Sequence, residues 1–454
     1  MATKTTERTP LLRRFRPGLP GTLEPAPVDD VVDTAGVVEA AAAPSGPGLA
    51  GRTFESLSNR GFRWYFFSMF GWFASMNMQM LVRGYIVFEL TGSYAALGLV
   101  SLANAIPGLV LSLPGGAIAD RVSKKRVVQL GQLSNTVVSA AIAFLMLSGM
   151  LVFEHLVACA VIQGSINSLL MPARQSMISE IVDDARLMNA VALNTAAMNT
   201  MRLIAPAIGG VLLATFGGGW AYVLMACLYC AGAVFLIPVR LNPQKSSARA
   251  NSGGWLQGFS DIAAGCRYMA ADRTVLMILS INLIIVLFSM PYQMMLPGFA
   301  SDVLGAGPGR LGLLMTITGA GSLAGSLALA SLPARNRGLI LLLGSLLMGV
   351  SLVFFSISTW YWATAAIMLG VGVGQAARMS LGNVLLQSYT DAAYRGRVMS
   401  IYLMEFSLVS LGTFIIGVMS NVIGVQVALG VTSVLLVVLV TGVLVFMPRM
   451  RRLP

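Results

Sequence analysis

The sequence is poor in charged residues, histidine and cysteine, and each scarcity excludes a class of protein. Only 11% of its 454 residues are charged and 56% are hydrophobic, whereas a soluble globular protein has roughly 25% charged residues. His155 is the single histidine, which argues strongly against histidine-based catalysis and a multi-histidine metal site. The four cysteines do not form two paired C-x-x-C motifs, so neither a disulfide framework nor a zinc cluster is expected. We therefore expect an integral membrane protein. It is expected to bind no cofactor and not to be an enzyme.

Long apolar runs are what the sequence has in abundance. A bilayer core of about 30 Å requires a helix of roughly 20 apolar residues, and spanning backbone must satisfy its hydrogen bonds internally. The pattern predicts an all-α membrane protein with twelve spans, at 64–89, 95–118, 126–149, 155–179, 188–215, 219–238, 274–299, 309–331, 338–357, 360–388, 397–422 and 425–447.

These runs divide the chain into five parts. Residues 1–62 hold seven of the 19 prolines and lack the apolar core of a signal peptide, so they are predicted to be a disordered cytoplasmic tail. We expect one six-helix bundle over 63–238 and a second over 274–448. The linker between them, 239–273, has apolar residues at helical spacing from Trp255 to Met269, which predicts an amphipathic helix on the membrane surface. Residues 449–454 form a short basic tail.

The basic residues are distributed unevenly between the two sides of the predicted spans. From Trp64 onward there are 22 lysines and arginines, of which 17 lie on one side, whereas the opposite side has only Arg310. By the positive-inside rule, the side with 17 faces the cytoplasm, as do both termini. The net charge of +12 is thus explained by topology and lipid headgroups and does not indicate nucleic-acid binding.

The two sets of six spans are weakly similar to each other. An ungapped shift of 214 residues pairs Gly98 with Gly312, and a shift of 208 pairs Gly164 with Gly372. These and similar matches indicate two copies in the same orientation. In such a parallel repeat, the substrate site lies between the halves near the midplane of the membrane.

Two motifs resemble those of the major facilitator superfamily. The segment from Gly116 to Arg126, GAIADRVSKKR, is similar to the superfamily's G-x-L-a-D-R-x-G-R-K motif. A second block from Pro172 to Gly210, with ELTGS at Glu89–Ser93, resembles the branch that contains the enterobactin exporter and macrolide efflux proteins. The resemblance covers about residues 60–450. It implies the major facilitator fold, with two parallel-repeat six-helix bundles, and a secondary transporter.

Three positions depart from the patterns of that superfamily. Ser123 replaces the glycine of the loop motif, and Ala334 stands in the second half where Asp120 stands in the first. In the fourth span, the stretch from Ala160 to Gly164 reads AVIQG. It lacks the arginine of the antiporter pattern R-x-x-q-G. In that family, this arginine is associated with proton coupling.

Two segments are expected to act in gating. The first is the loop after the second span, with Asp120, Arg121, Lys124 and Lys125. It is either an anchor at the headgroups or, as the resemblance implies, a latch in which Asp120 pairs with a basic group or a helix N-terminus.

The second gating segment is in the fifth span, where the stretch up to Gly210 resembles the antiporter motif G-x-x-x-G-P-x-x-G-G. Pro206 frees a carbonyl group, and Gly209 and Gly210 allow a neighbouring helix to approach closely. Ordinary tight packing would explain these residues as well. The resemblance implies a seal on the cytoplasm-facing leak of an exporter, and we include Arg202 in this gating set.

Charged residues inside spans are costly unless they are paired or hydrated. Arg83, Arg202, Arg378 and Glu405 fall in spans 1, 5, 10 and 11. Since spans 1 and 10 line the central cavity in the superfamily, the predicted substrate-binding residues are Gln79, Arg83, Gln375 and Arg378. Two cavity arginines favour an anionic substrate, which a guanidinium group binds in a bidentate manner. The alternative is internal pairing of these arginines.

Glu405 is the acid that lies well inside a span. It is either a carboxyl group that takes up and releases a proton, which would make it the proton-coupling residue, or a permanent partner of Arg202 or Arg378.

These observations predict a monomeric secondary transporter in the inner (plasma) membrane. It is expected to export a small, amphipathic or anionic molecule by alternating access against protons, with membrane lipids around it. Two alternatives remain: an importer of an organic solute on the same fold, and a membrane sensor or lipid-handling protein that transports nothing.

Overall fold

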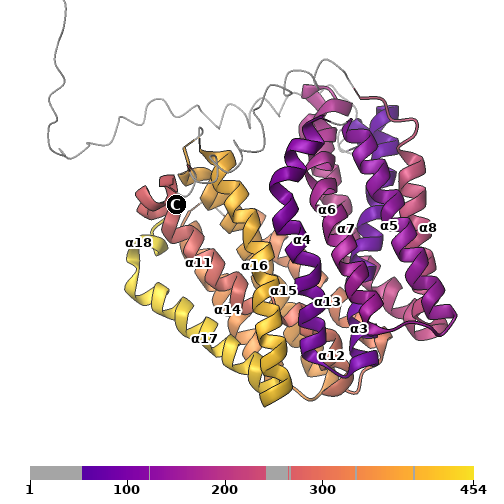
Figure 1. The fold of residues 1–454 in the computed structure, drawn as a ribbon. Coiled ribbons are helices and arrows are strands. Elements are labelled where there is room, and N and C mark those ends of the chain that lie inside the picture. Colours follow the sequence, from indigo (N-terminus) through magenta and orange to yellow (C-terminus); the bar gives the residue numbers. More distant parts are fainter. Residues whose placement is uncertain are drawn as a thin grey trace, which may run out of the picture. The chain divides into compact units, whose positions relative to one another are not determined.

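The computed structural model describes residues 54–121, 123–241, 264, 267–332, 335–391 and 394–453, apart from the side chains of 112–121, 184, 400, 403, 404 and 406. Within these ranges all regular elements are helices (Figure 1), which confirms the predicted all-α fold. Residues 1–53 of the predicted tail, residues 242–263 of the predicted linker and Ala334 lie outside the described ranges.

Six long helices make up the first half of the described chain: α3 (Arg60–Thr91), α4 (Tyr94–Arg121), α5 (Lys124–Leu147), α6 (Phe153–Ile181), α7 (Asp184–Phe216) and α8 (Gly218–Phe235). The second half contains α11 (Arg273–Ser289), α12 (Tyr292–Asp302), α13 (Pro308–Ser331), α14 (Arg337–Ile357), α15 (Tyr361–Tyr389), α16 (Arg395–Ile423), α17 (Val425–Phe446) and the short α18 (Pro448–Arg451).

Local sequence explains where several of these helices begin and end. The Asn59 side chain accepts hydrogen bonds from the backbone N–H groups of Gly61 and Phe62 at the start of α3, as expected for an N-cap residue. The same helix stops at Gly92, whose φ of 59° is in the left-handed region that favours glycine. Asp272 caps α11 in the same way as Asn59 caps α3.

The chain just before α3 differs from the predicted tail, which extended to residue 62. Glu55–Ser58 form a 3-10 helix that lies against the start of α7. The Ser56 backbone N–H donates to Asn189 Oδ1 at 3.1 Å, and its hydroxyl donates to the Arg186 carbonyl at 3.1 Å. Glu55 also pairs with Arg186 at 3.3 Å. These tertiary contacts, which the proline-rich composition did not reveal, fix residues 55–59.

The predicted single span at 274–299 is two helices in the structure. Proline has no backbone N–H and its ring excludes a regular helix on its N-terminal side, and α11 accordingly ends before Met290 and Pro291. The two pieces still belong to one apolar stretch, Arg273–Asp302, that is long enough to cross a membrane. The break places the first turn of α12 in the interior of the bundle, where Tyr292 is buried.

Nine stretches of the described chain are long and apolar enough to cross a membrane. The long helices α3 and α15 fall short of that level, and the described part of α16 contributes a shorter apolar stretch, Ser407–Ile423. These three helices carry the predicted polar candidates, Gln79 and Arg83 on α3, Gln375 and Arg378 on α15, and Glu405 on α16. The count of twelve spans, like the predicted domain boundaries, stays a prediction.

The two halves meet where the backbones of four helices come close together, α4 against α16 and α7 against α13 (Figure 1). A Cβ atom on Gly98 would lie 2.6 Å from Phe414 Cα, and one on Gly312 would lie 2.8 Å from the Pro206 carbonyl oxygen. Because the opposing atoms belong to the backbone, no side-chain rotation makes room for a methyl group. Only glycine permits these helix crossings.

The predicted internal repeat relates these contacts to one another. The shift of 214 takes Gly98 to Gly312, and the shift of 208 takes Pro206 to Phe414, so the two crossings between the halves are equivalent. The same two shifts relate two crossings within the halves. A Cβ on Gly164 of α6 would overlap the Asn104 carbonyl of α4, and a Cβ on Gly372 of α15 would overlap the Thr318 carbonyl of α13.

Polar contacts reinforce the junction at one end of the bundle. We call the end at which α3 stops and α4 starts the Gly92 end, and the end at which α4 stops and α5 starts the Ser123 end. At the Gly92 end, the Tyr94 hydroxyl donates to Asp302 Oδ2 at 3.1 Å and the Tyr94 backbone N–H donates to Asn421 Oδ1 at 2.9 Å. Helices of both halves are therefore tied together there.

We expect Gly98→Ala to destabilise the protein by about 1–3 kcal/mol, the usual cost of overpacking, because α4 and α16 must separate. The matched control is Gly442→Ala in α17, where a Cβ would meet no atom within 4 Å. Both substitutions gain the same helix propensity, about 1 kcal/mol. Thermal unfolding of the purified variants in one detergent measures the difference, and equal melting temperatures would contradict the close crossing.

Candidate functional site

A cavity lies between the two halves. Five helices line it, two from the first half and three from the second, through the residues Asn77, Met80, Arg202, Pro206, Tyr292, Gln293, Leu296, Met315, Thr318, Gly319, Ser322 and Gln375. Most of these side chains are apolar or neutral, as is typical of small-molecule sites. Arg202 is the one charged residue among them.

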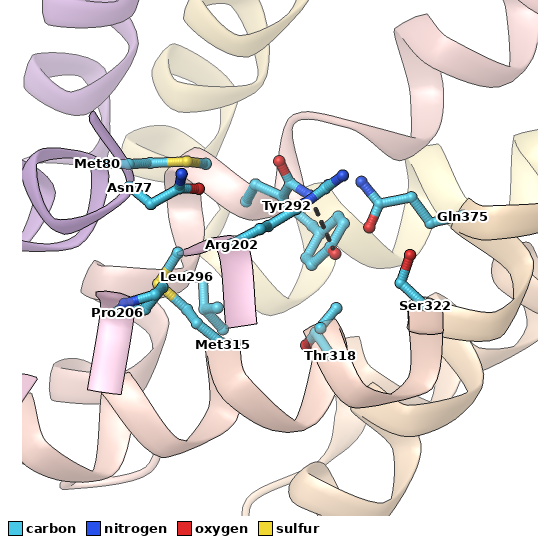
Figure 2. A pocket seen from close by; sticks show the side chains of 12 residues that line it. Asn77, Met80, Arg202, Pro206, Tyr292, Leu296, Met315, Thr318, Ser322 and Gln375 are labelled. Carbon is cyan, nitrogen blue, oxygen red and sulfur yellow. Dashed lines mark hydrogen bonds between the residues drawn. The ribbon is translucent and has the colours of Figure 1, made fainter. Parts of the chain in front are cut away.

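Arg202 extends from α7 across this central cavity. Figure 2 shows its side chain directed towards Tyr292 of α12 and Gln375 of α15. Its Nη1 lies 3.6 Å from Met379 Sδ, a weak acceptor. Sequence reasoning assigned Arg202 to gating, whereas the structure brings it to the wall of the cavity.

Two further cavities adjoin the central one. One lies towards the Gly92 end and includes Arg83 and Asn104, and Met80 is the wall that it shares with the central cavity. The other lies between α7 and α13 and shares Arg202, among others, with the central cavity. Its lining residue Ser326 lies near the Ser123 end of α13. The three cavities thus follow one another along the bundle.

Gln79 and Arg83 of α3 share a partner that the sequence did not single out. Gln163 Oε1 on α6 accepts from Gln79 Nε2 at 2.5 Å and from Arg83 Nη1 at 3.2 Å. Gln79 is buried and does not line the three cavities, whereas Arg83 reaches one of them. The two predicted binding residues of span 1 therefore have different surroundings.

The predicted residues of the second half are also separated. Gln375 lines the central cavity. Arg378, only three residues further along α15, is 1% exposed and its Nε and Nη2 have no hydrogen-bond partner among the described atoms. Its polar neighbours are Tyr402 and Glu405.

Glu405 lies on α16, is 6% exposed and has Arg378 as a charged neighbour. Within the part of the chain that the structure describes, no basic nitrogen lies within the 4.0 Å of an ion pair from its carboxylate. The interaction with Arg378 is thus electrostatic and longer than a direct salt bridge. This geometry favours neither a fixed ion pair with Arg378 nor one with Arg202.

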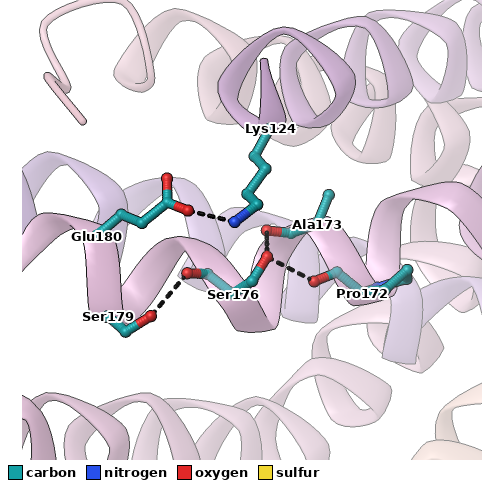
Figure 3. Close-up of polar contacts among 6 residues, drawn as sticks. All are labelled: Lys124, Pro172, Ala173, Ser176, Ser179 and Glu180. Atoms are coloured by element: carbon teal, nitrogen blue, oxygen red, sulfur yellow. Dashed lines mark hydrogen bonds and ion pairs between the residues drawn. The ribbon is translucent and has the colours of Figure 1, made fainter. Parts of the chain in front are cut away.

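The predicted gating loop is described in part. The side chains of Asp120 and Arg121 are outside the described ones. Lys124, in the first turn of α5, forms an ion pair with Glu180 of α6, and both side chains are largely buried (Figure 3). Lys125 donates to the carbonyl groups of Ile237 and Val239 just after α8, at 2.7 and 2.8 Å.

Pro206, Gly209 and Gly210 lie where α7 crosses α3 and α13. A Cβ on Gly209 would touch Met78 of α3 at 3.4 Å, and one on Gly210 would lie 2.6 Å from the Pro308 carbonyl oxygen. These residues therefore allow close packing towards the Gly92 end. Pro206 also borders the central cavity.

Sequence reasoning missed two charged residues of the interior. Glu180 is the buried partner of Lys124, and its position at the end of a predicted span gave no sign of that pairing. Arg174 is 1% exposed, and its guanidinium carbon lies 4.3 Å from the centre of the Trp72 ring, a cation–π arrangement. Its place inside the span predicted at 155–179 was a signal that could have been used.

Comparisons with known proteins agree on the class of this chain. Residues 52–453 match the profile of the protein family described as "Transmembrane secretion effector". The chain is 24% identical over 369 residues to the Staphyloferrin A transporter of Staphylococcus aureus, covering 80% of this chain and 90% of that one. It is 23% identical over 389 residues to the multidrug efflux pump Tap of Mycolicibacterium fortuitum, covering 84% and 94% of the two chains.

Solved structures show the same fold. A crystal structure of the nucleoside transporter NupG matches with a TM-score of 0.68 at 15% identity, over 86% of this chain and all of that one. A crystal structure of the peptide transporter POT matches with a TM-score of 0.69, also at 15% identity, over 87% and 95% of the two chains. At this level of identity the likeness concerns the fold alone.

We expect Glu180→Gln to destabilise the protein by about 3–5 kcal/mol, because it leaves the ammonium group of Lys124 partly buried and unpaired. Glu55→Gln is the matched control, since the Glu55–Arg186 pair is exposed and worth about 1 kcal/mol or less. Chemical unfolding in detergent measures both. The double exchange Lys124→Glu with Glu180→Lys should regain stability, and equal losses in the two Gln variants would contradict a buried pair.

Proposed function

Because the chain belongs to the transmembrane secretion effector family of the major facilitator superfamily, and is thus a multi-pass membrane transporter and not an enzyme, we propose that it exports a small, amphipathic or anionic molecule. The transport is driven by protons and proceeds by alternating access of one central site. Export is supported by the family's description and by the efflux relative.

The observation that carries the proposal is the guanidinium group of Arg202 at the wall of the central cavity. Among the described residues that line that cavity none is acidic, so the positive charge faces the space that the substrate would occupy. A charge inside a membrane protein is costly unless it is hydrated or paired, and a substrate anion supplies the missing partner. Gln375, Thr318 and Ser322 add neutral hydrogen-bonding groups beside it.

Alternating access is supported by the way the halves meet. The contacts at Gly98, Gly312 and Tyr94 close the Gly92 end, whereas cavities continue from Arg202 towards the Ser123 end. With the 17 basic residues in the cytoplasm, the Ser123 end is cytoplasmic, both termini lie on that side, and the membrane is the inner membrane. Substrate then enters from the cytoplasm and leaves once the glycine crossings separate.

Proton coupling is assigned to Glu405. Its carboxyl group is the acidic neighbour of Arg378, which is one turn along α15 from Gln375 of the central cavity. Protonation of Glu405 removes a negative charge beside a buried arginine and so changes the electrostatic potential at the cavity wall. The residue that takes up the proton and the residues that contact substrate are thereby linked through α15.

Direction and substrate are tested together. Metabolites that accumulate in a strain lacking the protein are identified and then offered to inverted membrane vesicles containing it. We expect such a metabolite to enter the inverted vesicles when their lumen is acidic, which corresponds to export from the cell. Uptake by right-side-out vesicles would instead show an importer, and the absence of flux for all accumulated metabolites would favour a sensor or lipid-handling protein.

Glu405→Gln is expected to abolish transport driven by a pH gradient, because the amide cannot take up a proton. Exchange of labelled for unlabelled substrate, which needs no net proton movement, should continue. Glu154→Gln is the matched control, since Glu154 is exposed in the first turn of α6. If the Glu405 variant still concentrates substrate against its gradient to the wild-type level, Glu405 is not the coupling residue.

A further inference from the structure

Met80 is the wall shared by two of the three cavities. The central cavity contains Arg202, and the cavity towards the Gly92 end contains Arg83. An unbranched, flexible methionine side chain is thus what separates two spaces that each hold one arginine.

Neither arginine has an acidic partner in the described part of the chain. Arg83 donates from Nη1 to the neutral Gln163 amide at 3.2 Å, and Arg202 points Nη1 at Met379 Sδ. Within the described residues, no carboxylate lies within 4.0 Å of either guanidinium group. Each guanidinium has five N–H donors, so most of its hydrogen-bonding capacity remains available to a ligand.

The remaining polar groups of the two cavities are neutral. Asn104, Ser101 and Ser410 accompany Arg83, and Asn77 and Thr318 accompany Arg202. Two positive charges without counter-charges, in adjoining spaces, match a ligand that carries two negative charges some distance apart. A ligand with one negative charge would leave one arginine uncompensated inside the membrane.

We propose that Met80 separates two anion subsites of one binding site, and that the transported molecule carries two anionic groups, one held by Arg202 and the other by Arg83. The middle of the molecule lies across Met80 and is apolar or neutral. The proposal rests on the proposed transport function, of which it specifies the substrate class.

The test measures binding to the purified, full-length protein in nanodiscs. The probes are the α,ω-dicarboxylates from glutarate to sebacate and their monomethyl esters, which have matched length and one charge fewer. Isothermal titration gives each affinity. We expect dicarboxylates of one length range to bind about tenfold to a hundredfold more tightly than their esters, the gain of one further charged hydrogen-bonded contact.

Arg83→Gln and Arg202→Gln should each reduce the affinity for the dicarboxylate to that for its ester. Arg310→Gln, at the exposed start of α13, is the matched control and should leave the difference intact. Met80→Trp fills the junction, and should abolish the preference for the dicarboxylate while ester binding persists, which also shows that the variant is folded.

Equal affinities for diacid and ester at every length, or a preference that survives Arg83→Gln, would overturn the proposal. Flux of the accumulated metabolite, measured in the same preparations, separates this result from the proposed function. Directed transport without any preference for two charges rejects the two subsites alone. A preference for two charges without flux rejects the transport direction or mechanism and leaves the two subsites in place.

Discussion

Backbone meets backbone where the two halves of this protein cross, at Gly98 against Phe414 and at Gly312 against Pro206. In a bilayer, helices gain little from the hydrophobic effect by associating, and close van der Waals contact between small residues takes its place. These crossings hold α4 to α16 and α7 to α13 near the Gly92 end. One of the three cavities lies beside the α4–α16 crossing, and the other two lie further towards the Ser123 end.

The few charges of the interior are accommodated in different ways. Lys124 and Glu180 pair directly, and Arg174 lies over the ring of Trp72. Arg83 shares a neutral amide with Gln79. Arg202 faces open space. A charge that is paired within the protein contributes to stability, whereas a charge that faces a cavity is available to bind a ligand. This difference distinguishes structural from functional arginines in this protein.

The repeat explains why the site has contributions from both halves. Shifts of 214 and 208 residues relate the crossings within and between the halves, so the same helix-packing solution occurs twice. The functional side chains do not follow that symmetry. The shift of 208 takes Gln163, the partner of Arg83, to Val371, and the two halves therefore offer chemically different walls to one shared cavity.

The amino-acid sequence by itself was sufficient to predict the helical membrane fold, the position of most helices and the superfamily, because apolar runs, glycine spacing and loop motifs are local features. It also indicated that Arg83, Arg202 and Arg378 are unusual. It did not reveal the break at Pro291 in a run that is apolar throughout, nor the docking of Glu55–Ser58.

Only the tertiary structure decided which of those arginines reaches a cavity. Helical periodicity places Gln79 and Arg83 on one face of α3, and Gln375 and Arg378 close together on α15. The packing of α6, α12 and α16 then buries one member of each pair and leaves the other beside open space. Burial depends on helices that are distant in sequence, and no local pattern contains that information.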